Sequence, residues 1–263
     1  MLFKFLKNLI NLIDKIDHKK SVKFKLILQQ LSVNVFKVKI KKKNIEFYVK
    51  NYHCYKRYST ILTKEKGTIE WIDGFKKKDL LWDIGANIGI YTLYASIISK
   101  VNVVAFEPII NSAQVLRKNI ELNNLSRNVK LLNIAIGKKN SNTKIFYESN
   151  HAGSARHSLI KDARTKRFEN ILCLSPSFIL KQKIVNYPNH IKIDTDGNEL
   201  EILKSMGEIL KYKKLKSLCI ENEFGKGESS RKKKIVKILK KNNFYLKKID
   251  FLNIGYNMFF YRK

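Results

Sequence analysis

The sequence is poor in cysteine and histidine, and neither residue type stands in a redox or metal-binding pattern. Its three cysteines, Cys54, Cys173 and Cys219, are far apart, so no C-x-x-C motif is present. All three lie in apolar or aromatic surroundings, which predicts buried, reduced thiols of a cytoplasmic protein. The five histidines lack the H-E-x-x-H and H-x-x-x-H spacings, so no metal site is expected.

Acidic residues are scarce as well. The chain has 22 Asp and Glu against 53 Lys and Arg, which gives a formal net charge of +31. Such an excess is typical of proteins that bind nucleic acid or an anionic membrane. The lysines are spread along the chain, however, and Lys, Asn and Ile are abundant together, as codon bias in AT-rich genomes produces. Three interpretations stay open: a solvated surface that reflects mutational bias, lipid binding and nucleic-acid binding.

Long apolar runs are absent, and lysines interrupt the hydrophobic stretch over residues 1–31. The stretch is too often broken to span a membrane, and it lacks the cleavage site of a secretory signal. Its apolar residues recur at helical spacing: Leu2, Phe3, Leu6, Leu9, Ile10, Ile13 and Ile16. We expect a basic amphipathic helix that either lies on an anionic membrane or packs against protein. The protein is therefore expected in the cytoplasm, and membrane contact would place it peripherally at the cytoplasmic face of the inner membrane.

Proline is rare, with three residues in 263, and no proline-rich linker divides the chain. The length and the 44% hydrophobic content suffice for one large α/β domain with an appendage. Residues 1–70 are predicted to form an N-terminal extension, made of the amphipathic helix and a β-hairpin over residues 33–49, where apolar and polar residues alternate. Residues 51–67 are expected to be irregular. Residues 71–263 are predicted to form the main domain.

Strand and helix patterns alternate from residue 79 onward, which is typical of βαβ units and a parallel sheet. One segment, residues 140–188, is too long for a single helical crossover and is predicted to be a substrate-side insertion. The predicted strands span 80–84, 101–106, 129–134, 191–194 and 215–221. The predicted helices lie near 88–99, 109–123, 198–210 and 229–241. Residues 244–249 and 256–261 are expected to close the chain as a hairpin.

The most informative stretch is LLWDIGANIG, residues 80–89, in which a short strand ends in an acid and a glycine turn. In open α/β folds this turn lies at the carboxyl edge of the sheet, where nucleotide-like ligands bind. Gly85 fits the first glycine of a dinucleotide fingerprint, but Asn87 and Ile90 occupy the other two glycine positions, which argues against NAD. No Lys-Ser or Lys-Thr pair follows, so a phosphate-binding P-loop is excluded. An adenosyl ligand without phosphates remains.

The next predicted strand ends in Glu107-Pro108. A carboxylate about twenty residues after the glycine turn accepts the hydrogen bonds of a ribose diol in folds of this kind. Glu107 is therefore the predicted ribose ligand.

Four motifs in this order resemble the FkbM-type S-adenosylmethionine-dependent methyltransferases: DIGANIG-x-YTL from Asp83, VVAFEP from Val103, NIAIG from Asn133 and IKIDTDGNELEIL from Ile191. The resemblance covers about residues 68–263. It implies a Rossmann-like class I methyltransferase fold with a seven-stranded, mostly parallel sheet and an antiparallel last strand. It also implies S-adenosylmethionine as cofactor and a hydroxyl acceptor, often on a sugar or glycoconjugate. The family's usual V-E-G-F-E reads T-D-G-N-E here, at residues 195–199.

On this interpretation the cofactor-binding residues fall in three groups. Those of the turn face the amino-acid end of the cofactor, Glu107 and Pro108 lie at the ribose, and two residues after the third strand frame the adenine, as the resemblance suggests. The turn residues are Asp83, Gly85, Ala86, Asn87 and Gly89, and the adenine residues are Asn133 and Ala135. Backbone amides at the start of the following helix can take a carboxylate.

Methyl transfer to a hydroxyl needs a base within hydrogen-bond reach of the acceptor proton. Asp194 ends the fourth strand and is the first candidate, with Asp196 second. Glu199 follows closely, and three neighbouring acids should raise at least one pKa. We expect Glu199 to stabilise the start of the next helix instead. A calcium loop is a poor alternative: Asp194, Asp196 and Asn198 match its first ligands, but its sixth position holds Glu199 rather than glycine.

The polar stretch SNHAGSARHS, residues 149–158, supplies the candidate acceptor-binding residues His151, Arg156 and His157. These side chains could instead be solvated. Two other functions stay open. A nucleic-acid methyltransferase fits the charge, but residues 194–197 lack the Asn/Asp-Pro-Pro-aromatic loop of amino-group methylation, and the nearby acids would repel phosphate. A non-catalytic partner module would not need the cofactor motifs.

Overall fold

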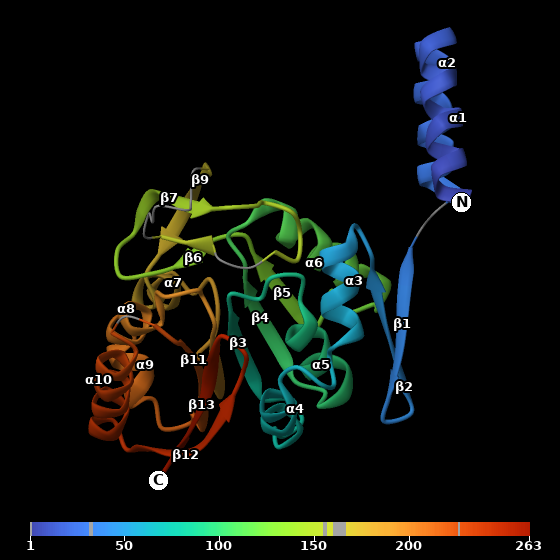
Figure 1. Cartoon of the computed structure of the whole chain (residues 1–263). Helices are drawn as coiled ribbons and strands as arrows, with labels where there is room; N and C mark the ends of the chain where they lie inside the picture. Colours follow the sequence, from blue (N-terminus) through green and yellow to red (C-terminus); the bar gives the residue numbers. More distant parts are fainter. Residues whose placement is uncertain (1, 32–33, 155–156, 160–166, 226) are drawn as a thin grey trace. The chain divides into compact units, whose positions relative to one another are not determined.

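The computed structural model describes residues 2–31, 34–154, 157–159, 167–225 and 227–263. It divides into two compact units, Met1–Val35 and Phe36–Lys263, which are treated separately. The second unit contains the main sheet (Figure 1).

A seven-stranded sheet forms the centre of the second unit, with the order β12-β13-β11-β10-β3-β4-β5. Strands β3, β4, β5, β10 and β11 pair in parallel, and β13 inserts antiparallel between β11 and β12. This confirms the predicted sheet and its reversed last strand. The strands are β3 (Leu80–Ile84), β4 (Asn102–Phe106), β5 (Val129–Leu132), β10 (His190–Ile193), β11 (Ser217–Glu223), β12 (Phe244–Phe251) and β13 (Gly255–Arg262).

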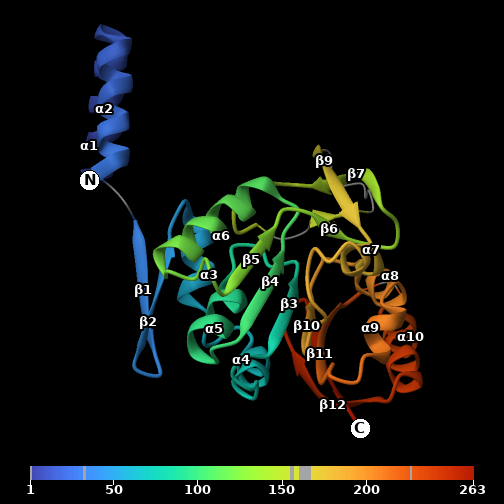
Figure 2. The ribbon, with the colours of Figure 1, turned by 180° about the vertical axis from the view of Figure 1, so that it is seen from behind.

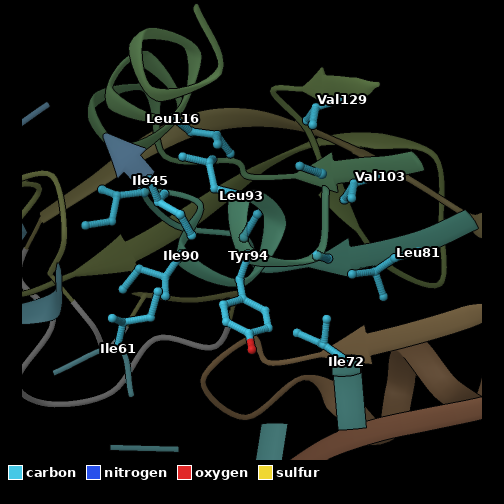
Figure 3. Packing of buried hydrophobic residues seen from close by; sticks show 14 of the residues in the cluster. Ile45, Ile61, Ile72, Leu81, Ile90, Leu93, Tyr94, Val103, Leu116 and Val129 are labelled. Carbon is cyan, nitrogen blue, oxygen red and sulfur yellow. The ribbon is translucent and has the colours of Figure 1, made fainter. Parts of the chain in front are cut away.

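Apolar residues on both faces of the central strands bury the sheet between two helical layers. Along β3, Leu81 packs into one core cluster and Trp82 into the other, because successive side chains of a strand point to opposite faces. Val103 and Val104 of β4 divide in the same way. Figure 3 shows the first cluster, in which Leu81, Val103 and Val129 meet residues of the covering helices. A strand buried on both faces explains the continuous apolar runs of the sequence.

Helices α4 (Lys66–Asp73), α5 (Ile90–Ile98) and α6 (Ile110–Leu122) supply the first cluster. Helices α7 (Pro176–Lys181), α8 (Glu199–Lys204), α9 (Gly207–Lys211) and α10 (Glu228–Lys241) supply the second. Figures 1 and 2 show α4 and α5 on one side of the sheet and α8, α9 and α10 on the other. The single helix predicted over residues 198–210 is wrong, because α8 ends at Lys204. There the Ser205 hydroxyl donates to the carbonyl of Ile202 at 2.6 Å, and Gly207 follows.

The predicted hairpin is present as β1 (Val35–Ile40) and β2 (Lys43–Tyr48). Its residues Ile45 and Phe47 are fully buried in the first core cluster. The backbone N–H of Tyr48 donates to Asn119 of α6 at 2.7 Å. Residues 36–70, assigned from sequence to the extension, thus belong to the same packed unit as residues 71–263.

The expectation that residues 51–67 are irregular is wrong, because Tyr52–Ser59 forms helix α3. Its first turn is capped by Asn51, whose side chain accepts from the N–H of Cys54 at 2.9 Å. Cys54 and Tyr58, one turn apart, anchor the helix in the core. The predicted buried state of Cys54, Cys173 and Cys219 is confirmed.

The insertion and the residues before it form a small second sheet of order β6-β9-β7-β8. Its strands are β6 (Ala135–Ile136), β7 (Ser141–Tyr147), β8 (His157–Ser158) and β9 (Arg167–Leu174). The third strand of the main sheet therefore ends at Leu132, earlier than predicted, because the chain then crosses into this second sheet.

The first unit contains two helices, α1 (Leu2–Ile16) and α2 (His18–Leu31), rather than one. Asp17 lies at the break and accepts the N–H of Lys20 at 3.0 Å, so it caps α2. Lys25 pairs with Asp14 at 2.9 Å. One continuous helix would hold these residues about 16 Å apart along its axis, so α2 folds back on α1. In the part of the chain that the structure describes, no helix is long and apolar enough to cross a bilayer.

Candidate functional site

A cavity lies at the carboxyl edge of the main sheet and contains about 1060 Å³ of empty space that is continuous with solvent. Its lining comes from the turns after β3, β4 and β10, from the small sheet, and from the segment between α3 and α4. The lining includes eight predicted site residues: Gly85, Ala86, Asn87, Glu107, Pro108, Ala135, Asp194 and Asp196.

The turn after β3 depends on Gly85. Its φ is +84°, and a Cβ built there would lie 1.8 Å from the carbonyl oxygen of Asp194. Only glycine permits this close approach, which brings the β3 turn and the end of β10 to the same wall of the cavity. Gly89 has a φ of +85° and faces the side chain of Leu116. It allows α5 to begin against α6 and does not line the cavity.

Asp83 lies behind the wall rather than on it. The carboxylate is buried and accepts a hydrogen bond from Thr92 Oγ1 of α5 at 2.6 Å. Burial raises the pKa of this carboxyl, and the charge of Lys192 opposes the shift. Its second oxygen, Oδ1, has no hydrogen-bond partner among the described residues. In this geometry Asp83 ties the turn to α5.

Glu107 follows β4 and reaches the turn from the neighbouring strand. Its two carboxylate oxygens accept the backbone N–H groups of Asn87 at 2.7 Å and Ile109 at 2.8 Å. Burial raises its pKa to about 7, although these two hydrogen bonds lower it. Each carboxylate oxygen has a second lone pair, so both can still accept a hydroxyl from a ligand in the cavity.

Asn87 joins the turn to the insertion. Its Nδ2 donates to the carbonyl of Ser154 at 2.8 Å. Its Oδ1 is buried and has no partner in the described part of the chain. A buried acceptor without a donor fits a ligand that brings an N–H or O–H group. The ammonium and the ribose hydroxyls of S-adenosylmethionine are such donors, so these residues fit the predicted cofactor.

Asn133 and Ala135 were both assigned to the adenine, and the structure separates them. Asn133 is exposed and does not line the cavity. Its Nδ2 donates to the carbonyls of Glu107 at 2.7 Å and Pro108 at 3.0 Å, so it holds the loop after β4. Ala135 lines an apolar wall with Ile134 and Ile136.

A buried ion pair lies at the end of β10. Lys192 is 2% exposed, and its Nζ lies 2.5 Å from Oδ2 of Asp194. Burial lowers the pKa of Lys192, but the carboxylates of Asp194, Glu65 and Asp83 more than compensate and raise it above its usual range. Burial likewise raises the pKa of Asp194, and Lys192 reverses this and holds it below its usual range. Both groups are therefore charged at neutral pH.

Glu221 of β11 completes this cluster. The register pairs Ile193 with Ile220, which sets Glu221 beside Asp194. The two carboxyl groups share a hydrogen bond. Burial and the negative charge of Asp194 raise the pKa of Glu221 well above its usual range, so Glu221 carries the proton and donates it.

The other acids after β10 have separate roles. Glu199 accepts the backbone N–H groups of Thr195 at 2.8 Å and Gly197 at 3.1 Å. It thus stabilises the turn before α8, as expected for an acid at a helix start. Asp196 lines the cavity with a φ of +53°.

The predicted acceptor-binding residues, His151, Arg156 and His157, all belong to the insertion. His151 is exposed and lies outside the cavity lining, and its ring stacks on His53 of α3 with 6.2 Å between centroids. The backbone of His157 pairs with Tyr147 in the small sheet. Arg156 lies outside the described residues. Among the residues that the structure describes, no three His, Cys, Asp or Glu side chains are grouped as metal ligands.

Several polar lining residues were not predicted, among them Arg57, Glu65, Tyr91 and Lys192. Lys192 stood in the sequence as a lysine between two isoleucines of a buried strand, which signals a paired charge. Tyr91 lies in the quoted motif and places its ring 5.0 Å from the ammonium of Lys192. Arg57 and Glu65 come from the segment expected to be irregular, and the Asn51 cap was the available signal for its helix.

Comparison with known proteins places this site in a family. The chain matches the methyltransferase FkbM domain over residues 83–252, well over half of its length. It is 30% identical over 136 residues to the hexuronic acid methyltransferase AglP of Haloferax volcanii. That match covers 51% of this chain and 53% of the relative, so the chain spans about half the length of the curated relative it matches.

Similarity to solved structures is weak. The precorrin-6y C5,15-methyltransferase of Geobacter metallireducens has a TM-score of 0.46 and 13% identity, over 76% of this chain and 87% of that one. TrmK of M. capricolum, solved with S-adenosylhomocysteine, has a TM-score of 0.44 and 12% identity, over 74% and 67%. The assignment rests on the domain match, which includes the turn, Glu107 and Asp194. The chain belongs to the FkbM methyltransferase domain family.

Proposed function

We propose that this protein transfers a methyl group from S-adenosylmethionine to a hydroxyl of a sugar acid or of a glycan that contains one. The observation that carries the proposal is the arrangement at one sheet edge of the Gly85 turn, the Glu107 carboxylate and the unpartnered Oδ1 of Asn87. The sugar acid is suggested by the hexuronic acid methyltransferase that shares 30% identity.

When bound, the cofactor supplies a methyl group on a sulfonium. In the complex Glu107 would accept hydrogen bonds from the ribose, Asn87 Oδ1 would accept one from the cofactor, and Ile134, Ala135 and Ile136 would exclude water from the adenine. Binding from several sides fixes the orientation of the reacting atoms, which contributes about 7–11 kcal/mol in well-oriented reactions.

Asp194 receives the acceptor proton. Lys192 keeps this carboxylate ionised, so it is ready to accept at any working pH. An ionised aspartate is a weak base towards a free hydroxyl. It becomes sufficient as the new bond forms, because the acceptor oxygen then gains positive charge and its proton becomes acidic.

The test uses radiolabelled S-adenosylmethionine with glucuronic acid, a glycolipid extract and bulk RNA as separate acceptors. We expect label in the sugar-acid or glycolipid fraction. The variant D194N should reduce turnover by at least 100-fold and should change the affinity for S-adenosylhomocysteine less than threefold. D196N, run in parallel, separates the two candidate bases. Label in RNA alone, or no heat of binding with S-adenosylhomocysteine, would contradict the proposal.

We further propose that the first unit binds an anionic membrane surface and so brings the enzyme to glycolipid acceptors. On α1, Phe5 is 63% and Leu12 is 56% exposed, and these residues lie two turns apart on one face. Lys4, Lys7 and Lys15 lie on the same helix. Exposed apolar side chains among lysines are typical of helices in a membrane interface.

Co-sedimentation with vesicles tests this contact. The wild-type chain should bind vesicles that contain phosphatidylglycerol and should ignore pure phosphatidylcholine. Replacing Phe5 and Leu12 by serine should abolish binding. The matched control is Phe251→Ser, which removes another exposed aromatic residue, 70% exposed on β12, and should change nothing. Equal binding by all three proteins would exclude the contact.

A further inference from the structure

Arg57 is a cation in the cavity that has no carboxylate partner among the described residues. Two further cations line the same space, and each faces an acid: Lys192 lies 2.5 Å from Asp194, and Lys64 lies 3.9 Å from Glu65. The guanidinium of Arg57 bonds only to backbone carbonyls in the described part of the chain. Its Nε donates to Gly153, and its Nη2 donates to Ser154 at 3.2 Å.

These two bonds fix the guanidinium at the wall of the cavity. Ser154 is also the residue whose carbonyl accepts from Asn87, so Arg57 lies beside the cofactor turn. Its positive charge lowers the pKa of Glu107, against the larger effect of burial, and that of Asp194, where burial and Lys192 act more strongly. Arg57 thus lies within electrostatic reach of both carboxylates and forms an ion pair with neither.

The segment that carries Arg57 is fixed rather than loose. Gly153 has a φ of +84°, and a Cβ there would lie 3.1 Å from the backbone N of Cys54, so the insertion packs directly on the first turn of α3. Asn51 Nδ2 donates to the carbonyl of Ala152 at 3.1 Å. The guanidinium has five N–H groups and uses two of them on carbonyls, so a planar edge remains for a ligand.

We propose that Arg57 binds a carboxylate in this cavity, an inference that rests on the proposed function. Guanidinium groups match carboxylates through two parallel hydrogen bonds, and a half-buried cation without an acid partner is stabilised by such a ligand. The proposed reactants offer two carboxylates: that of the methionine part of the cofactor and that of the sugar-acid acceptor. Both have the same chemistry, and the experiment distinguishes them.

Calorimetry on the full chain uses R57M, R57K and three probes. S-adenosylhomocysteine carries the methionine carboxylate, and 5′-methylthioadenosine lacks it. Glucuronic acid, titrated into protein loaded with S-adenosylhomocysteine, carries the acceptor carboxylate, and glucose is its neutral counterpart. If the cofactor is the partner, R57M weakens S-adenosylhomocysteine at least tenfold and leaves 5′-methylthioadenosine unchanged. If the acceptor is the partner, R57M weakens the binding of glucuronic acid at least tenfold and leaves the affinities for S-adenosylhomocysteine and 5′-methylthioadenosine unchanged.

R57K keeps the charge but not the paired donors, so its loss should lie between wild type and R57M. The matched control is Asn51→Asp. It still caps α3 through its carboxylate but cannot donate to Ala152, so it loosens the same loop without touching the cavity. Asn51→Asp should bind all probes as wild type does.

Two kinds of result overturn the proposal. In the first, R57M binds every probe with wild-type affinity. In the second, R57M weakens S-adenosylhomocysteine and 5′-methylthioadenosine equally, or Asn51→Asp reproduces its losses, which would assign Arg57 to packing of the loop. Failure of the proposed function is seen separately, because the wild-type chain would then give no heat with S-adenosylhomocysteine.

Discussion

Nζ of Lys192 lies 2.5 Å from Oδ2 of Asp194, and the lysine is the more deeply buried partner. The two residues are two positions apart at the end of β10, so their side chains leave the strand on the same face. An ion pair with a buried lysine is stabilising only while both charges are present, because Lys192 without Asp194 would lose its hydrogen-bonded counter-ion and has no solvent to replace it.

Removing one partner should therefore cost more than removing both. We expect K192M to lower the free energy of unfolding by about 3–5 kcal/mol, since it removes the cation that faces the carboxylates of Asp194, Glu65 and the buried Asp83. The double variant K192M/D194N should recover a large part of this loss. Urea denaturation of the four proteins in the double-mutant cycle measures the coupling. Additive losses would show that the pair is not energetically linked.

Glu221 should act on turnover through Asp194. Its amide replacement, E221Q, still has an N–H to donate to the Asp194 carboxylate, and we expect its kcat to stay within about threefold of wild type. E221A removes the donor and leaves the Asp194 carboxylate without this hydrogen bond. The kcat of E221A should therefore fall about tenfold to hundredfold. Rescue by glutamine identifies a positioning role. Equal losses in both variants would show that Glu221 must exchange a proton.

The sequence predicted the central strands well because each carries its own signal. β3 was placed at its observed bounds, Leu80–Ile84, since a short apolar run ends in an acid and a glycine turn. Parallel pairing of β3 and β4 brings Glu107 to Asn87, so the approach of this carboxylate to the glycine turn could be predicted too.

Features that depend on tertiary contacts were not predicted from the sequence. Helix α3 reads YHCYKRYS, with two buried residues and little periodicity, and it forms because Asn51 caps it and the core receives Cys54 and Tyr58. Arg57 reaches the cavity only through this helix. The side chain of Asn133 was assigned to a ligand, yet it bonds to two carbonyls of the loop after β4. No local pattern distinguishes these two roles of an asparagine.

Asn119 should be one of the most sensitive core positions. Its side chain is fully buried, its Nδ2 donates to Tyr58 Oη at 3.0 Å and to the Ile88 carbonyl at 2.8 Å, and its Oδ1 accepts from Tyr48. Asn119→Leu leaves the Tyr48 N–H and the Ile88 carbonyl unpaired and removes one of the two hydrogen bonds of Tyr58 Oη, and it should lower the free energy of unfolding by about 3 kcal/mol. The control is Asn123→Ala, one turn later and half-buried, where water can replace the lost bonds. We expect a loss below about 1 kcal/mol there. Similar losses in the two variants would contradict the network.

The affinity for S-adenosylhomocysteine should depend on pH through Glu107. Burial raises the pKa of this carboxyl to about 7, so below pH 7 the free protein holds it mainly protonated. Ribose hydroxyls donate to the ionised form, and binding in acid must therefore first remove a proton. We expect the affinity to fall about tenfold per pH unit below pH 7 and to level off above pH 8, as measured by calorimetry.

The same titration acts on stability with the opposite sign. The pKa of Glu107 is about 7 in the folded protein and 4.5 ordinarily, so the fold favours its protonated form, and the stability of the free protein falls as pH rises through this interval. His190 opposes this trend. Burial lowers its pKa to about 4, so between pH 6.5 and 4 the unfolded chain binds a proton that the folded protein does not, and stability falls as pH falls. The variant E107Q isolates the effect of pH on binding. It should bind S-adenosylhomocysteine more weakly than wild type at every pH, and its affinity should not change with pH below pH 7. A slope that persists in E107Q would assign the titration to another group.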